Sequence, residues 1–157
     1  MLPKTHFILG LIFVVVLYFF FSPIISFSSL IIIFLSSILI DIDHYIYHIV
    51  KNKNWNLFQG YKWYIKNIKR VRGMTKEQRK KTYIGFYFLH GIEILIALFL
   101  LGEYLSPVFT YILIGFVFHL VMDSISEIIL EQRQDKISLI FNLLTFKKLT
   151  NIENLND

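Results

Sequence analysis

The stretch FILGLIFVVVLYFFFSPIISFSSLIIIFLSSILI, residues 7–40, contains 34 consecutive positions without a charged side chain. About 20 apolar residues in an α-helix suffice to cross the hydrocarbon core of a bilayer. One helix of this length would overshoot the membrane, so the stretch must contain a turn. Ser22-Pro23 is the expected place, because serine caps helix N-termini and proline is favoured in the first helical turn. We therefore predict two membrane spans, over residues 4–21 and 23–48.

A second pair of spans is predicted further along the chain. Residues 83–101 and 107–130 are mainly apolar, and the Ser106-Pro107 step between them repeats the Ser-Pro signal of the first pair. The predicted fold class is all-α: an integral membrane four-helix bundle of two helical hairpins. A chain of 157 residues leaves room for one such domain, with a C-terminal tail over residues 132–157.

Composition agrees with a membrane protein and limits its chemistry. The chain is 55% apolar and 17% aromatic, which is unusual for a soluble domain that also carries 16 Lys and Arg residues. It has no cysteine, so disulfides and thiolate metal sites are excluded. Any metal ion would have to be held by imidazole and carboxylate groups.

The basic residues predict the orientation of the bundle. Eleven Lys and Arg residues lie between Lys51 and Lys81, and with four spans the other five fall on the same side of the membrane. By the positive-inside rule, that side and both termini are cytoplasmic, in a multi-pass protein of the plasma or inner membrane. The 51–82 loop has the pattern of a basic amphipathic helix, which predicts binding to anionic lipid headgroups. The alternative is a charged linker that serves only to orient the protein in the membrane. No nucleic acid partner is expected, and the sequence does not determine the oligomeric state.

Ionisable side chains within the predicted spans are the main functional signal. Such groups are costly in a membrane unless they face a cavity, a partner or a metal ion. At about 1.5 Å per residue, the histidines would line a funnel open to the cytoplasm. The histidines and carboxylates of the spans are His6, Asp41, Asp43, His44, His48, His90, Glu93, His119, Asp123 and Glu127. Imidazole and carboxylate ligands suit zinc, with manganese and iron as alternatives.

Four short motifs carry a resemblance to a known family. They are Thr5-His6, Asp41-Ile-Asp-His44, Leu89-His90 and Gly115-Phe-Val-Phe-His-Leu-Val-Met-Asp123. In order and approximate position they resemble the small YdjM-like membrane proteins, known as inner-membrane metal-dependent hydrolases. That family is distantly similar to the zinc-dependent phospholipase C and P1 nuclease superfamily.

The resemblance implies a site and a reaction. It implies a phosphoester substrate, with a lipid phosphoester as the candidate, and two or more divalent ions that activate water. The implied metal ligands are His6, Asp43, His44, His90, His119 and Asp123. Asp41 is the implied general base or orienting residue, and possible additional ligands are Glu93, Glu127 and His48.

The chain departs from the family at two places. Ile40 stands where the family usually has proline, and Gly85-Phe86 stands where it usually has His-Arg before the third helix. Without that arginine, phosphate binding would fall to the lysines of the 51–82 loop.

Two other functions fit the same residues, and a structural protein without activity is a further alternative. A divalent-metal binding or transport protein could use these ligands as a path, but it would need acidic residues toward the far side, where only Glu103 is available. A bundle could also hold b-type haem between His90 and His119, although haem favours apolar surroundings and Glu93 and Asp123 lie one turn away.

Overall fold

The computed structural model describes residues 2–134 and 137–154, which are mostly helical. The helices are α1 (Pro3–Phe21), α2 (Phe27–Leu39), α3 (Ile42–Asn52), α4 (Leu57–Gly73), α5 (Lys76–Lys81), α6 (Ile92–Tyr104), α7 (Val108–Ile129) and α8 (Leu139–Thr145). Two-residue strands β1 (Thr82–Tyr83) and β2 (Thr150–Asn151) pair in parallel, and 3-10 turns cover Phe146–Lys148 and Ile152–Asn154. The predominance of helix agrees with the predicted class.

Three helices in the described part of the chain are long and apolar enough to cross a membrane. They are Pro3–Phe21, Phe27–Asn52 (α2 and α3 taken together) and Val108–Ile129. The predicted spans 4–21 and 107–130 match the first and third of these closely. The second begins at Phe27 rather than at Pro23, because Ser26, not Ser22, caps its N-terminus by accepting a hydrogen bond from the Ser29 N–H.

The predicted span 83–101 is wrong in its boundaries. Helix α6 has 13 residues and begins only at Ile92, so it is about 20 Å long against a bilayer core of about 30 Å. The preceding residues are not helical because tertiary contacts occupy their polar groups: the Leu89 N–H and the His90 ring both bond to Asp43. Glycine at 85 and 91 further weakens helix formation there. Hydropathy alone does not separate such a segment from a helix.

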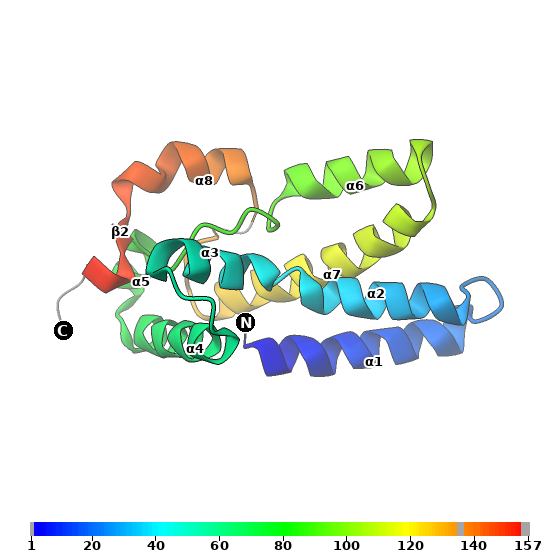
Figure 1. The fold of residues 1–157 in the computed structure, drawn as a ribbon, viewed down its shortest axis with the longest axis horizontal. Coiled ribbons are helices and arrows are strands. Elements are labelled where there is room, and N and C mark those ends of the chain that lie inside the picture. Colours follow the sequence, from blue (N-terminus) through cyan, green and yellow to red (C-terminus); the bar gives the residue numbers. More distant parts are fainter. Residues whose placement is uncertain (1, 135–136, 155–157) are drawn as a thin grey trace.

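Helices α1, α2, α6 and α7, called the bundle below, have their connecting turns at one end of the molecule (Figure 1). Among the described residues, three candidate spans are found where the sequence predicted four. Helix α2 packs against α1 and α7, and α6 packs against α7. The α1–α2 and α6–α7 turns lie together at the right of the view, while α3, α4, α5 and α8 lie toward the left. The predicted 51–82 loop is therefore largely helical, and it forms a cap on the bundle with α8.

The bundle is apolar outside and partly polar inside. Phe19 and Phe20 are each 75% exposed, whereas His6 and His119 are 2% and 0% exposed. A soluble protein rarely presents so large a continuous apolar surface. The distribution fits a lipid environment, in which the polar groups must find partners within the protein.

The last described residues tie the C-terminal segment to the cap. Glu153 lies 2.6 Å from the Lys51 ammonium and accepts a 2.5 Å hydrogen bond from the Trp63 indole. Burial raises the pKa of the Glu153 carboxyl group, but these two partners outweigh burial and hold the pKa below its ordinary value. The C-terminal segment therefore joins α3 to α4.

Small residues allow α2 and α7 to pack closely. A Cβ atom on Gly115 would lie 2.5 Å from the Ile33 carbonyl oxygen and 2.9 Å from the Ser37 nitrogen. On the other side of α2, a Cβ on Gly10 of α1 would lie 2.7 Å from Ser37 Oγ. Close backbone approach at small residues is a usual way for helices to associate in membranes. This packing sets the position of α2 against the two helices that flank it.

Gly115→Ala should destabilise the bundle, because the added methyl group must push α7 away from the α2 backbone. Overpacking of this kind costs about 1–3 kcal/mol. Thermal unfolding of the purified protein in detergent would measure the loss. Gly73→Ala is the matched control, since a Cβ at Gly73 meets nothing within 4 Å among the described residues. Equal unfolding temperatures for the two variants would contradict the proposed close contact.

Candidate metal centre

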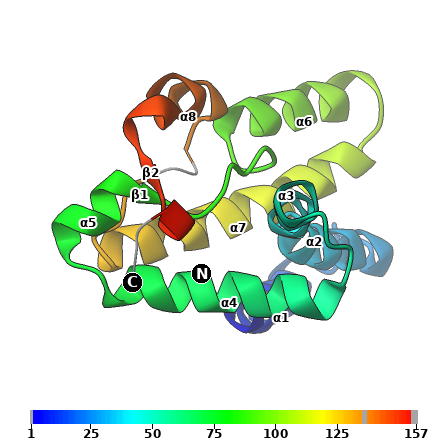
Figure 2. The same cartoon turned by 60° about the vertical axis from the view of Figure 1, so that its left-hand side comes forward.

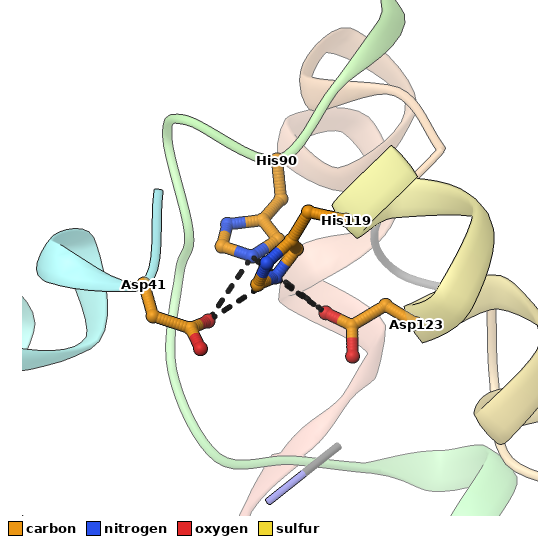
Figure 3. Close-up of side chains that lie close together, drawn as sticks. All are labelled: Asp41, His90, His119 and Asp123. Carbon is orange, nitrogen blue, oxygen red and sulfur yellow. Dashed lines mark hydrogen bonds and ion pairs between the residues drawn. The ribbon is translucent and has the colours of Figure 1, made fainter. Parts of the chain in front are cut away.

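Four side chains from three separate segments of the chain lie close together (Figure 3). Asp41 lies at the break between α2 and α3, His90 in the segment before α6, and His119 and Asp123 one turn apart on α7. One ligand atom of each lies within 4.8 Å of the other three. These four residues are called the cage below.

The distances within the cage are those of ligands around one ion. His119 Nε2 lies 3.3 Å from His90 Nε2 and 3.3 Å from Asp123 Oδ2. Asp41 Oδ1 lies 3.4 Å from His119 Nε2 and 3.5 Å from His90 Nε2, and His90 Nε2 lies 3.7 Å from Asp123 Oδ2. Four ligands arranged tetrahedrally at 2.0–2.1 Å from zinc are separated by roughly 3.3 Å. The cage thus has the size that zinc or a similar divalent ion requires.

The chemistry of the cage also fits a cation. Asp41 Oδ1 is buried and, within the described part of the chain, has no hydrogen-bond partner. Two carboxylates lie together at this site, and buried charges of one sign are costly unless a partner compensates them. A divalent ion would neutralise both and coordinate the Asp41 oxygen. The buried His/Asp group could therefore hold a metal ion.

Hydrogen bonds on the far side of each histidine ring orient it toward the cage. His119 Nδ1 lies 2.7 Å from the Ser37 carbonyl oxygen, so it must carry the proton and donate. His90 Nδ1 lies 2.9 Å from Asp43 Oδ2. When Nδ1 is the donor, the lone pair of Nε2 faces inward, which is the usual arrangement of metal-binding histidines.

Asp43 connects several parts of the site. Besides His90, it contacts His44 Nδ1 at 2.6 Å and accepts a hydrogen bond from the Leu89 N–H at 3.0 Å. Asp43, His44 and His90 form a second group with metal-ligand geometry. Its 2.6 and 2.9 Å separations are hydrogen-bond lengths, shorter than the edges of the cage. Asp43 is thus placed to orient two histidines.

His6 and His44 flank the cage. His6 Nε2 lies 3.1 Å from Asp123 Oδ1, the carboxylate oxygen on the side away from His119, and its ring stacks on His119 at 3.9 Å. The His44 ring stacks on Tyr87 at 3.8 Å. All six residues that the sequence predicted as ligands are therefore at or beside one centre, together with Asp41.

Three possible additional ligands lie outside the cage. His48 Nδ1 lies 2.8 Å from the side chain of Asn52, one turn further along α3. Glu93 accepts hydrogen bonds from Ser138 Oγ at 2.6 Å and from the Leu139 N–H at 2.9 Å. Glu127 follows Asp123 by one turn of α7 and lines a separate pocket.

The sequence did not predict the groups that contact the histidines on the side away from the cage. The Ser37 carbonyl and the Tyr87 ring are examples. A backbone carbonyl has no side-chain signature, and Tyr87 is one of nine tyrosines without a distinctive spacing. The early end of α2 is what makes the Ser37 carbonyl available: the Asp41 N–H bonds to the Ile38 oxygen, three residues back, instead of to Ser37.

Access to the cage is from the side of Asp41. The Asp41 side chain is 17% exposed, whereas those of His90, His119 and Asp123 are 0% exposed. A mostly apolar pocket of about 120 Å³ reaches Asp41 between α3, the start of α4 and Pro3. His44 and Tyr64 also line it. A ligand would approach the centre through this pocket.

No family model, curated protein or solved structure matches this chain. The resemblance to the YdjM-like proteins therefore stays a prediction that depends on the four motifs.

His119→Ala should lower the metal content of the purified protein by about one ion per chain, because a cage of three ligands holds the ion poorly. Elemental analysis would measure the change. His48→Gln is the control, since His48 is also a buried histidine but lies outside the cage, and it should keep the full content. Unchanged metal in His119→Ala would exclude the cage, and a Soret band in the wild type would establish haem instead.

Asp43→Asn should weaken metal affinity without abolishing binding. The amide keeps the size of the side chain but holds the His90 ring less firmly, and loss of such an outer partner typically costs about 10–100-fold in affinity. Competition with a chelator of known affinity would give the ratio to wild type. Complete loss of the ion would make Asp43 a direct ligand, as the sequence implied.

Proposed function

We propose that the protein is a membrane-bound metal-dependent hydrolase of phosphoesters, a lipid phosphoester being the best candidate. The observation that carries the proposal is the cage: two imidazoles and two carboxylates at tetrahedral spacing, already oriented by hydrogen bonds, with one ligand exposed to a pocket. A divalent ion bound there would supply Lewis acidity, which activates water and polarises a phosphoryl oxygen near neutral pH. Zinc suits the ligand set best.

The residues divide into three roles in this proposal. Asp41, His90, His119 and Asp123 bind the ion. Asp43 keeps the rings of His90 and His44 in place. His44 lines the access pocket with Nδ1 held by Asp43, so it is placed to hold or move a proton for a ligand in that pocket. In this proposal Asp41 is a metal ligand instead of the general base or orienting residue that the resemblance implied. Asp43 is an orienting residue instead of a ligand.

A lipid substrate is supported by the surroundings of the centre. The access pocket is mostly apolar, and Leu57 at its edge is 67% exposed. Helices α1, α2 and α7 run from the centre to the turns with apolar outer surfaces. An amphiphile could bring its phosphate group to the cage while its apolar part stays in the membrane.

The two alternatives have less support. In the described residues, Glu103 is the one acidic side chain near the turns, so a transported cation would lack ligands beyond the cage. For haem, the Nε2 atoms of His90 and His119 are only 3.3 Å apart with carboxylates beside both, which leaves no space for a porphyrin between them.

Activity should depend on the cage. With zinc or manganese supplied, the protein should release phosphate or a headgroup from a mixed lipid extract, and Asp123→Asn should reduce the rate by at least about 100-fold. His48→Gln should turn over at the wild-type rate. Release that is equally fast in Asp123→Asn would exclude the proposed centre. Metal uptake into vesicles without any turnover would favour the transport alternative.

The proposed orientation places the cap and both termini in the cytoplasm. Because the chain has no cysteine, single cysteines introduced at Glu103 and Lys80 can report the two sides. In intact cells, a membrane-impermeant maleimide should label Glu103→Cys, and it should label Lys80→Cys only after lysis. The opposite labelling pattern would reverse the topology.

A further inference from the structure

A second pocket lies in the cap, outside the cage. It occupies about 70 Å³ between α4, α5 and the end of α7, which lie together at the left of Figure 2. Three arginines line it: Arg72 from α4, Arg79 from α5 and Arg133 from the segment after α7. These arginines come from three separate segments, so the fold, not local sequence, gathers them.

Two of the arginines are held in place by hydrogen bonds, and each has a further N–H group that is not used in them. Arg79 Nη1 donates to the Met74 carbonyl oxygen at 2.7 Å, and Arg133 Nη2 donates to Asn142 Oδ1 at 3.1 Å and to Thr145 Oγ1 at 2.6 Å. Within residues 2–134 and 137–154, Arg79 Nε and Arg133 Nη1 are buried and have no hydrogen-bond partner. A buried charged donor without an acceptor is costly, so two of them beside one pocket indicate an absent acceptor.

The charge of the lining defines the class of that acceptor. The three arginines carry +3 and Glu127 carries −1, which leaves +2 on the pocket. This charge repels cations and attracts a divalent anion. Guanidinium groups pair especially well with phosphate, because two parallel N–H donors match two of its oxygens.

We propose that this pocket binds a phosphate group, either free or as part of a lipid headgroup. The pocket adjoins the metal centre: Tyr64 lines both this pocket and the access pocket, and Tyr87 separates it from His44. The YdjM-like proteins usually have His-Arg where this chain has Gly85-Phe86. The arginines of the pocket would provide phosphate-binding groups in place of that arginine. Its use in substrate binding rests on the proposed hydrolase function, whereas phosphate binding itself does not.

Calorimetry on the full-length protein in detergent, after removal of metal with a chelator, would test the proposal. Inorganic phosphate is the first probe, and removing the metal ensures that phosphate does not simply bind at the cage. Arg79→Gln and Arg133→Gln should each weaken binding at least about tenfold, as expected when a charge-assisted pair is lost. Lys69→Gln is the control, because it removes one exposed positive charge from α4 without touching the pocket.

Calorimetry in the same detergent with short-chain phosphatidic acid as the second probe, and short-chain phosphatidylcholine for comparison, distinguishes the two sources of phosphate. Binding that needs phosphatidic acid and Arg79, without affinity for inorganic phosphate, identifies a lipid headgroup. Arg79→Lys keeps the charge but loses the paired donors, so its affinity should lie between wild type and Arg79→Gln. Circular dichroism would verify that each variant is folded.

Two results would overturn the proposal. The first is that Arg79→Gln and Arg133→Gln bind both probes as tightly as Lys69→Gln does. The second is that the wild-type protein binds neither probe. His119→Ala separates this site from the proposed function, since it should lose metal and turnover but still bind phosphate. A wild type that binds phosphate through the arginines but never turns over would refute the hydrolase and leave the phosphate pocket standing.

Discussion

The close approach of α2 and α7 at Gly115 is the constraint on which the site depends. Because Gly115 has no side chain, the α2 backbone can lie directly against α7. One turn further along α7, the Ser37 carbonyl then meets His119 Nδ1 at 2.7 Å. That contact fixes the tautomer and direction of His119, which is the ligand with the shortest distances to the other three. The packing of α2 on α7 and the geometry of the candidate metal site thus depend on the same close approach of the two helices.

The break between α2 and α3 is equally important to the site. A continuous helix would use the Ser37 carbonyl within itself and would turn Asp41 with the regular helical period. Ending α2 at Leu39 leaves the Ser37 carbonyl to His119 and places the Asp41 carboxylate in the cage. In a membrane, backbone groups freed in this way must find partners inside the protein. Here the freed carbonyl group of Ser37 accepts a hydrogen bond from His119, a residue of the cage.

The polar groups of the molecule are concentrated in two separate places, the cage and the arginine pocket. The cage, which is closed at three ligands and open at Asp41, is built from the α2–α3 break, the segment before α6, and α7, whereas the arginine pocket lies between α4, α5 and the end of α7. The apolar access pocket lies between α3 and α4. If phosphate and metal both bind, a ligand near Tyr64 would have an apolar surface, a cation and a basic pocket within reach. This combination suits an amphiphile with a phosphate headgroup.

From the sequence alone, the helical class and the apolar spans around residues 4–21 and 107–130 could be predicted, together with three of the four residues of the candidate metal site: His90, His119 and Asp123. These properties follow from composition and from the cost of ionisable groups in apolar helices, which are local. Contacts between distant segments place Asp41 in the cage and Asp43 behind it, and they leave residues 84–91 non-helical. Such contacts also bring Arg72, Arg79 and Arg133 to one pocket. Each of these depends on contacts between segments far apart in the chain, and neither hydropathy nor helical spacing carries information about such contacts.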